Sequence, residues 1–236
     1  MPRKPRLFLP GQPQHVVVRG HNRDPILARH DDFQYLYRCV RDAASRNGLA
    51  VHAWVFMQNH LHLLVTPETE QSLPRAMQSI GRRYAQYFNR TYRRSGSLWE
   101  GRYRAGLVDT ERYLLTCYRY IELNPVRAGI VKRPEEYVYS SYHANGLGKE
   151  DPLVMPHGVF LALVQGAMQG WGGGARAAPP PGGGGPAAGR GARRAPFGTQ
   201  VGPQHHSPQP PGPPPLGGRG QTPGIEREWR QEGGRD

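Results

Sequence analysis

The chain has 236 residues, a formal charge of +13 and a hydrophobic content of 37%. This composition suits a basic globular protein and argues against a membrane-embedded one, because no long apolar stretch or basic amphipathic anchor occurs. Two cysteines, Cys39 and Cys117, are too few for a disulfide framework or a zinc site. The basic start, residues 1–6, lacks the apolar core of a signal peptide, so we expect a cytoplasmic protein.

The end of the chain differs in composition from the rest. Residues 171–236 contain 18 Gly and 13 Pro. So much glycine and proline without a collagen-like period cannot bury enough apolar surface to offset the chain entropy. We therefore predict a folded domain over residues 1–168 and a disordered Gly/Pro-rich tail over residues 169–236.

Most of the positive charge belongs to the predicted domain. Residues 1–150 contain 23 Lys and Arg against 13 Asp and Glu, which accounts for +10 of the total charge of +13. A small basic domain favours a polyanionic partner, and nucleic acid is the first candidate.

Strand and helix signals alternate along this domain. In chain order, we predict a strand at 15–20, a helix at 31–47, strands at about 50–57 and 60–66, a helix at 72–94, a strand at 105–108, a helix from about 110 to 124, and a short helix at 159–164. Residues 58–59 form the hairpin turn, and Pro125 ends the third predicted helix. This order predicts an α+β, ferredoxin-like fold, in which helices pack on one face of an antiparallel sheet of four to five strands.

The second strand of the hairpin carries two histidines, His60 and His62, within the apolar run Met57–Val65. On a strand these two positions project to the same face, about 7 Å apart along the strand. Two imidazoles arranged in this way can bind one divalent cation. A pair of buried, hydrogen-bonded histidines is the alternative that the spacing leaves open.

Tyr120 and Asn124 lie four residues apart and so share a helix face, about 6 Å apart. If that face lies against the one that bears His60 and His62, two imidazoles, an amide oxygen and a phenol converge. Phosphoryl transfer through a covalent tyrosine needs such a set, because the metal withdraws charge from the phosphate that the tyrosine attacks. From the residues alone, a core tyrosine and an asparagine that caps the helix before Pro125 remain the alternatives.

Three motifs resemble a known family. They read Asn59-His-Leu-His-Leu-Leu-Val65, Gly96-Ser-Leu-Trp-Glu-Gly-Arg-Tyr103 and Tyr120-Ile-Glu-Leu-Asn-Pro-Val-Arg-Ala128. With residues 5–11 and 139–142, they are similar to the IS200-type Y1 transposase superfamily and, within it, to the REP-associated tyrosine transposases. The resemblance covers residues 3 to 165, and Gln58 stands where that family has Pro or Thr.

This resemblance implies a single-strand DNA nuclease and strand transferase of the HUH class. His60 and His62 match the metal-binding pair of the family, Tyr120 its nucleophile, and Asn124 its third metal ligand. The implied cofactor is Mg²⁺ or Mn²⁺. The implied substrate is single-stranded DNA with palindromic hairpins, which the enzyme cleaves beside the hairpin through a 5′-phosphotyrosine link. The implied setting is the bacterial nucleoid, and both monomers and homodimers are compatible with the resemblance.

Candidate DNA contacts follow from charge and position alone. They are Arg19, Asn22, Arg23, Arg82, Arg83, Arg102, Tyr103 and Arg104. On the helix at 72–94, the tyrosines recur at helical spacing, which favours core positions over stacking on DNA bases.

Two other function classes compete with the nuclease hypothesis. One is a retired catalyst that binds DNA or RNA hairpins, but such a binder needs neither the paired histidines nor Tyr120 and Asn124. The other is a nucleotide hydrolase of the histidine-triad kind, which we set aside because Leu64 occupies the position of its third histidine.

Overall fold

The structure is a computed structural model that describes residues 9–172. The predicted disordered tail lies outside the described residues from residue 173 on, as do residues 1–8 of the predicted arm. One compact unit includes residues 9–163, and a second begins at Val164, of which only the end of helix α6 (Gly158–Gly172) is described. The predicted boundary after residue 168 falls inside α6. No helix within residues 9–172 combines the length and apolar character that crossing a membrane requires.

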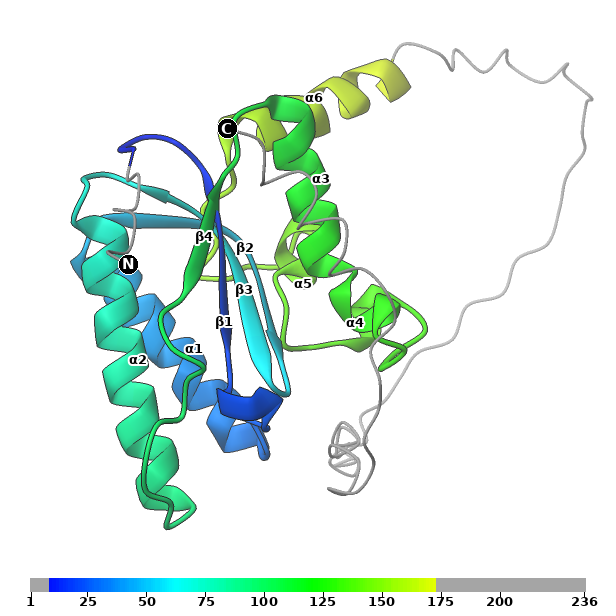
Figure 1. The fold of residues 1–236 in the computed structure, drawn as a ribbon. Coiled ribbons are helices and arrows are strands. Elements are labelled where there is room, and N and C mark those ends of the chain that lie inside the picture. The colour runs from blue at the N-terminus through cyan, green and yellow to red at the C-terminus, as the bar shows by residue number, and fades with distance from the viewer. Residues whose placement is uncertain (1–8, 173–236) are drawn as a thin grey trace, which may run out of the picture. The chain divides into compact units, whose positions relative to one another are not determined.

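Four strands form a single antiparallel sheet (Figure 1). They are β1 (Gln14–Arg19), β2 (Leu49–Met57), β3 (His60–Pro67) and β4 (Arg104–Leu107), in the order β2-β3-β1-β4. The turn at 58–59 joins β2 directly to β3, whereas helical crossovers join β1 to β2 and β3 to β4. The predicted α+β class with an antiparallel, ferredoxin-like sheet is therefore confirmed.

Helices α1 (His30–Arg46) and α2 (Ser72–Thr91) cover one face of this sheet (Figure 1). Because successive side chains of a strand point to opposite faces, every second residue of β1 and β3 is buried beneath them. These residues are Val16, Val18, Leu61, Leu63 and Val65. Tyr84 and Phe88 of α2 are also buried in this core, as their helical spacing predicts.

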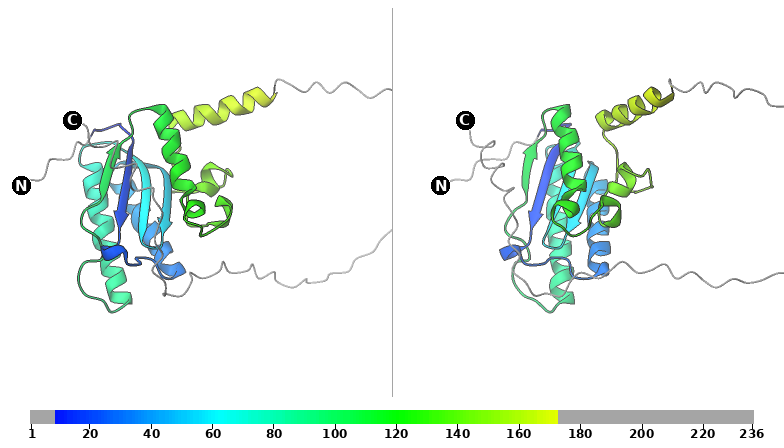
Figure 2. Two further views of the ribbon diagram at one scale, coloured as in Figure 1. Left: turned by 45° about the vertical axis from the view of Figure 1, so that its right-hand side comes forward. Right: turned by 90° about the vertical axis from the view of Figure 1, so that its right-hand side faces the viewer.

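Helix α3 (Glu111–Glu122) covers the opposite face (Figure 2). Its apolar stripe of Leu114, Cys117, Tyr118 and Ile121 is buried together with Ala53, Val55, Met57 and Leu64 of the sheet. The expectation that the helices pack on one face is therefore wrong. Most residues of β2 and β3 are buried whichever face they point to, so this sheet has cover on both faces.

Pro125 does not end the helix that carries Tyr120. Helix α3 ends at Glu122, and α4 (Asn124–Arg127) begins at Asn124 with Pro125 in its first turn. A proline is tolerated there because the first N–H groups of a helix have no partner within it. Pro125 thus starts a new helical turn, and Asn124 is its first residue instead of the cap of α3.

The chain after α4 closes the outer edge of β2. Two short helices, η2 (Pro134–Glu136) and α5 (Tyr142–Asn145), flank the segment concerned. Within it the carbonyl of Tyr139 accepts from the Phe56 N–H at 3.0 Å, and the Ser141 N–H donates to the Trp54 carbonyl at 2.9 Å. This edge of the sheet is therefore covered, as buried backbone groups require.

Candidate active site

The two histidines of the hairpin lie on the face of the sheet that α3 covers. His60 pairs with Arg19 and His62 with Val17 across β1, and directly paired residues of antiparallel strands share a face. The ring centroids of His60 and His62 are 4.9 Å apart. His62 is buried and His60 is half-buried. The side chains therefore project together, as their spacing predicts.

Each imidazole uses its Nδ1 atom for a neighbouring side chain. Nδ1 of His60 lies 2.7 Å from Oδ1 of Asn59, and Nδ1 of His62 lies 2.9 Å from Nε2 of His15. A second hydrogen bond of this kind orients an imidazole ring and leaves Nε2 as the nitrogen that faces a ligand.

His15 is a member of this site that the sequence analysis missed. Its ring stacks on that of His62, with centroids 5.1 Å apart and planes inclined by 19°. His15 has Leu64 as its direct partner on β3, so it reaches His62 diagonally. The alternation of β1 groups His15 with Arg19, but only the register between β1 and β3 brings that group to the paired histidines.

Helix α3 brings Tyr120 to the same place. The helix starts at Thr110, whose side chain accepts from the Tyr113 N–H, and its buried stripe faces the sheet. The ring of Tyr120 is half-buried, with its centroid 5.5 Å from that of His62 and 5.8 Å from that of His15. All three side chains belong to the same chain.

The ring of Tyr120 also has an arginine beside it. Cζ of Arg127, on α4, lies 5.3 Å from the ring centroid, within the range of a cation–π contact. Tyr118, two residues earlier, is a core residue instead, because its side chain is buried and its hydroxyl accepts from the His157 N–H at 3.0 Å. The two tyrosines therefore have different surroundings on one helix.

Asn124 lies one helical turn beyond Tyr120. It is half-buried and begins α4, where its carbonyl accepts from the Ala128 N–H at 2.9 Å. The break at Leu123 separates it from α3, so the two residues lie on consecutive helical segments. The amide oxygen of Asn124 is the third metal ligand that the family resemblance implies.

The buried histidines are neutral at physiological pH. Burial, followed by the nearby charges of His15, His60 and Arg19, holds the pKa of His62 well below its ordinary value. Burial also lowers the pKa of His15 to about 4. A neutral imidazole keeps a lone pair, which is the state that binds a metal ion.

A buried carboxylate ties α3 to the rest of the domain. Oε1 of Glu122 accepts from the Ser141 hydroxyl at 2.7 Å and from the Asn145 amide at 2.8 Å. Ser141 in turn accepts from the Trp54 N–H of β2 at 3.0 Å. Burial raises the pKa of Glu122. This network sets the position of the helix end that carries Tyr120, and nothing in the sequence pattern indicated it.

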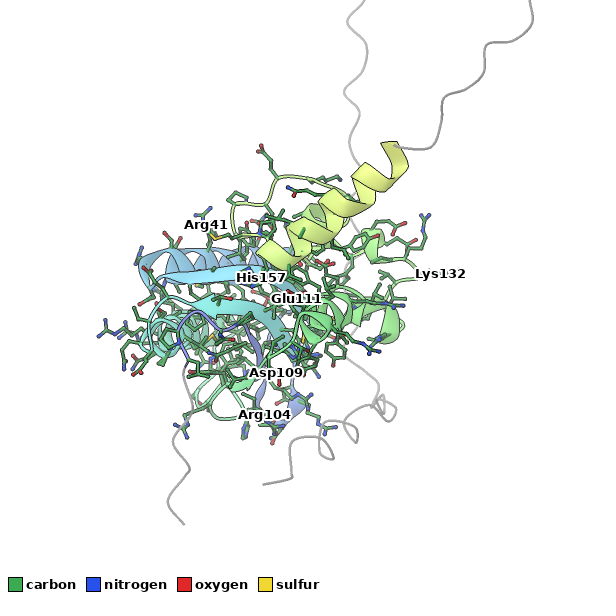
Figure 3. The ribbon with its side chains drawn as sticks, turned by 90° about the horizontal axis from the view of Figure 1, so that it is seen from above. Arg41, Arg104, Asp109, Glu111, Lys132 and His157 are labelled. Carbon is green, nitrogen blue, oxygen red and sulfur yellow. The ribbon has the colours of Figure 1, made fainter. Side chains whose placement is uncertain are left out.

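The structure divides the predicted DNA contacts into two groups. Arg19 lies on the site face because it pairs with His60 across β1 and β3. Arg104, which Figure 3 labels, lies on the same face because it pairs with Val17, the partner of His62. Asn22 and Arg23 are exposed in the turn η1 (His21–Arg23), which follows directly after β1. Arg19 is directly opposite His60 on the neighbouring strand, the turn follows it, and Arg104 is level with His62 in the sheet.

The other predicted contacts lie elsewhere. Arg82 and Arg83 belong to α2, on the opposite face of the sheet, and Arg83 pairs with Asp42 at 3.1 Å. Tyr103 packs against the core beneath α1 and α2, and Arg102 beside it is exposed. An arginine that holds two helices together already has a structural role, so Arg83 is a weaker candidate for DNA contact.

The donors predicted for a metal ion are two imidazoles and an amide. Within residues 9–172, no three His, Cys, Asp or Glu side chains are arranged to hold a metal ion. Any ion at the paired histidines would therefore take its remaining ligands from an amide such as Asn124, from water or from a substrate phosphate. Manganese and magnesium accept such oxygen-rich surroundings.

The sequence and the fold both match known transposases. A family model described as transposase, IS200-like, matches residues 11–124. A solved REP-associated tyrosine transposase bound to a REP hairpin has 19% sequence identity and a TM-score of 0.51, over 66% of this chain and 93% of that chain. A candidate transposase from Deinococcus radiodurans R1 has 25% identity and a TM-score of 0.37, over 51% of this chain and 95% of that chain. None of the curated proteins matches the sequence.

The matched residues run from the turn before β1 to Asn124. They include all four strands, the paired histidines and the helix that carries Tyr120. The solved structure that binds a REP hairpin has the same fold over most of its length. Over residues 11–124, the chain is therefore similar to the IS200-like transposases in sequence.

Proposed function

We propose that the protein cleaves and rejoins single-stranded DNA beside hairpins, through a covalent 5′-phosphotyrosine on Tyr120. The observation that carries this proposal is the 5.5 Å separation between the ring centroids of Tyr120 and His62, on the face that His62 shares with His60. The match of residues 11–124 to a transposase family model supports a reaction on DNA.

The paired histidines would hold the metal ion. The proposed ligands are Nε2 of His60, Nε2 of His62 and the amide oxygen of Asn124, and the proposed ion is Mg²⁺ or Mn²⁺. This mixture of nitrogen and oxygen donors favours Mn²⁺, because Mg²⁺ prefers oxygen ligands. When bound, the ion withdraws charge from the scissile phosphate.

Tyr120 is the proposed nucleophile. Its phenol oxygen attacks the phosphorus, the bond from phosphorus to the 3′ oxygen breaks, and that oxygen leaves as a hydroxyl after taking up a proton. The phenolic proton passes to solvent, and the 5′ end of the DNA stays on the tyrosine as a phosphodiester. Because one phosphodiester replaces another, the reverse attack by a 3′ hydroxyl reseals the strand without ATP.

Neighbouring arginines would assist this attack from two sides. Arg127 lies over the Tyr120 ring and can hold it in place, and its positive charge favours the developing phenolate. Arg19 is half-buried beside His60 and lies where a phosphate bound at the site can be contacted. Since Tyr120 meets the histidines of its own chain, we propose that a monomer is sufficient for cleavage.

The proposed substrate is a palindromic hairpin with a single-stranded flank. The solved relative with the same fold is bound to a REP hairpin, and the surplus of ten positive charges in residues 1–150 suits a nucleic acid. On this basis we assign the chain to the REP-associated tyrosine transposases and place its action on chromosomal DNA in the bacterial cytoplasm.

The test is the covalent adduct on a denaturing gel. The full-length protein, Mn²⁺ and a labelled hairpin oligonucleotide with a single-stranded flank are expected to give an adduct that Tyr120→Phe abolishes. Tyr118→Phe, two residues away in the core, is the matched control and is expected to keep the adduct. Hairpin binding, measured by fluorescence anisotropy, is expected to remain in both variants.

Two results would contradict the proposal. An adduct that persists in Tyr120→Phe would show that another residue is the nucleophile. Tight hairpin binding without any adduct, in the wild type and with Mn²⁺ present, would instead indicate a protein that binds hairpins and does not cleave them.

A further inference from the structure

Asn59 lies in the two-residue turn between β2 and β3, directly before His60, and both ends of its amide are engaged. Its Nδ2 atom donates to the carbonyl of Arg23 at 3.1 Å. Its Oδ1 atom lies 2.7 Å from Nδ1 of His60. One side chain therefore joins the histidine to the loop that follows β1.

These two contacts determine which nitrogen of His60 carries the hydrogen. A backbone carbonyl can only accept, so the amide nitrogen of Asn59 must face Arg23 and its oxygen must face His60. An amide oxygen also only accepts, and Nδ1 of His60 is therefore the donor. Because a neutral imidazole has a single N–H, its lone pair lies on Nε2, the nitrogen that a metal-binding histidine uses here.

The loop that receives this hydrogen bond has an unusual backbone. Asn22 and Arg23 have φ angles of 52° and 61°, which residues other than glycine rarely adopt. A Cβ atom at Gly20 would overlap the Asp24 carbonyl, so the tight approach of the chain requires glycine there.

Backbone hydrogen bonds join this loop to the hairpin turn. The Gly20 N–H donates to the carbonyl of Asn59, and the Ile26 N–H to the carbonyl of Gln58, each at 2.8 Å. The loop and the turn thus support each other, and the Asn59 side chain extends that support to the imidazole of His60.

We propose that Asn59 is a positioning residue of the metal site. It holds His60 in the Nδ1–H tautomer and links that imidazole to the loop that carries Asn22 and Arg23. The inference rests on the proposed function for the role of His60 as a ligand, and it assigns a role to a residue outside the proposed donor set. A DNA strand bound by this loop would thereby affect the position of the His60 imidazole through the side-chain amide of Asn59.

Three variants of the full-length protein separate the two contacts of Asn59. Asn59→Leu removes both hydrogen bonds at similar side-chain size, and Asn59 is not among the described non-glycine residues with a positive φ, so the backbone tolerates leucine. Asn59→Asp keeps the acceptor for His60 but loses the donor to Arg23. Asn89→Leu is the control, because Asn89 makes the same kind of bond, from Nδ2 to the Gly96 carbonyl at 3.0 Å, on helix α2.

Two measurements on each variant give the readout. Long-range proton–nitrogen NMR of the metal-free protein, at about pH 8 where imidazole is neutral, reports the tautomer of His60. Calorimetric titration with Mn²⁺ reports the affinity of the site. We expect Asn59→Leu to lose the Nδ1–H tautomer and to bind Mn²⁺ about 10–100-fold more weakly. Asn59→Asp and Asn89→Leu are expected to keep the tautomer.

The outcomes distinguish this inference from the proposed function. An unchanged tautomer in Asn59→Leu would overturn the inference, whatever the metal affinity. If the wild type and His60→Ala bind Mn²⁺ equally, or neither binds it, the proposed metal site fails. The comparison of tautomers still tests the role of Asn59 by itself. If all four proteins bind Mn²⁺ with equal affinity, Asn59 does not position the ligand.

Discussion

Glu122 offers a test in which charge and hydrogen bonding are changed separately. The residue is 8% exposed, and its carboxylate accepts from the Ser141 hydroxyl and the Asn145 amide. Glu122→Ala leaves the buried Ser141 hydroxyl without its acceptor, which costs about 1–3 kcal/mol, while Asn145 keeps a second bond to the His52 carbonyl. We expect a net loss of about 2 kcal/mol, or a Tm lower by roughly 4–8 °C.

Glu122→Gln keeps the acceptor and removes the charge. The amide oxygen of glutamine can accept both hydrogen bonds, so this variant is expected to be at least as stable as the wild type at pH 7. The folded-state pKa of Glu122 is raised above its ordinary value of 4.5 by burial. The wild type therefore loses stability as the pH rises from the unfolded pKa through the folded one, and glutamine does not.

Urea unfolding between about pH 4 and pH 8, followed by circular dichroism, measures this difference. The free energy of unfolding of Glu122→Gln minus that of the wild type is expected to increase through that window and then to level off. A difference that does not depend on pH would refute the burial of this carboxylate. A glutamine variant as unstable as Glu122→Ala would refute the hydrogen-bonding argument.

Two further predictions concern the site. Arg19→Ala is expected to weaken hairpin binding and to lower the slope of log K against log salt concentration by about 0.7–1, whereas Arg83→Ala, whose arginine pairs with Asp42, is expected to leave that slope unchanged. Anisotropy titrations at several salt concentrations test this, and equal slopes in the two variants would contradict it. His15→Leu removes the partner of His62 Nδ1 and is expected to weaken Mn²⁺ binding about 10–100-fold by calorimetry. Unchanged affinity would mean that His62 is held by other contacts.

Local patterns predicted most of the secondary structure. Alternation along 60–66, helical spacing around Tyr84 and the cap at Thr110 all depend on residues close in sequence, and each element is found with its ends shifted by a few residues. The main differences are the helical restart at Asn124 and the greater length of α6. Both occur at helix ends, where local signals are weakest.

Local sequence patterns could not predict on which side of the sheet each helix packs. Residues 49–57 read as apolar on both faces, which is compatible with one covered face or two. Only the crossover paths in the folded chain put α1 and α2 on one side and α3 on the other. That division also separated Arg83 from the histidines, although charge alone had grouped them.

For the site, the sequence alone determined which residues can do the chemistry. The spacing of His60 and His62 places both imidazoles on one face, since a strand alternates with period two, and the motif around Tyr120 supplies the proposed nucleophile on a helix. The tertiary structure decided which partners hold these groups. The register of β1 against β3 brings His15 to His62, and the loop after β1 brings the Arg23 carbonyl to Asn59. Such partners are far apart in the chain, and their contact depends on strand pairing and packing that no local pattern records.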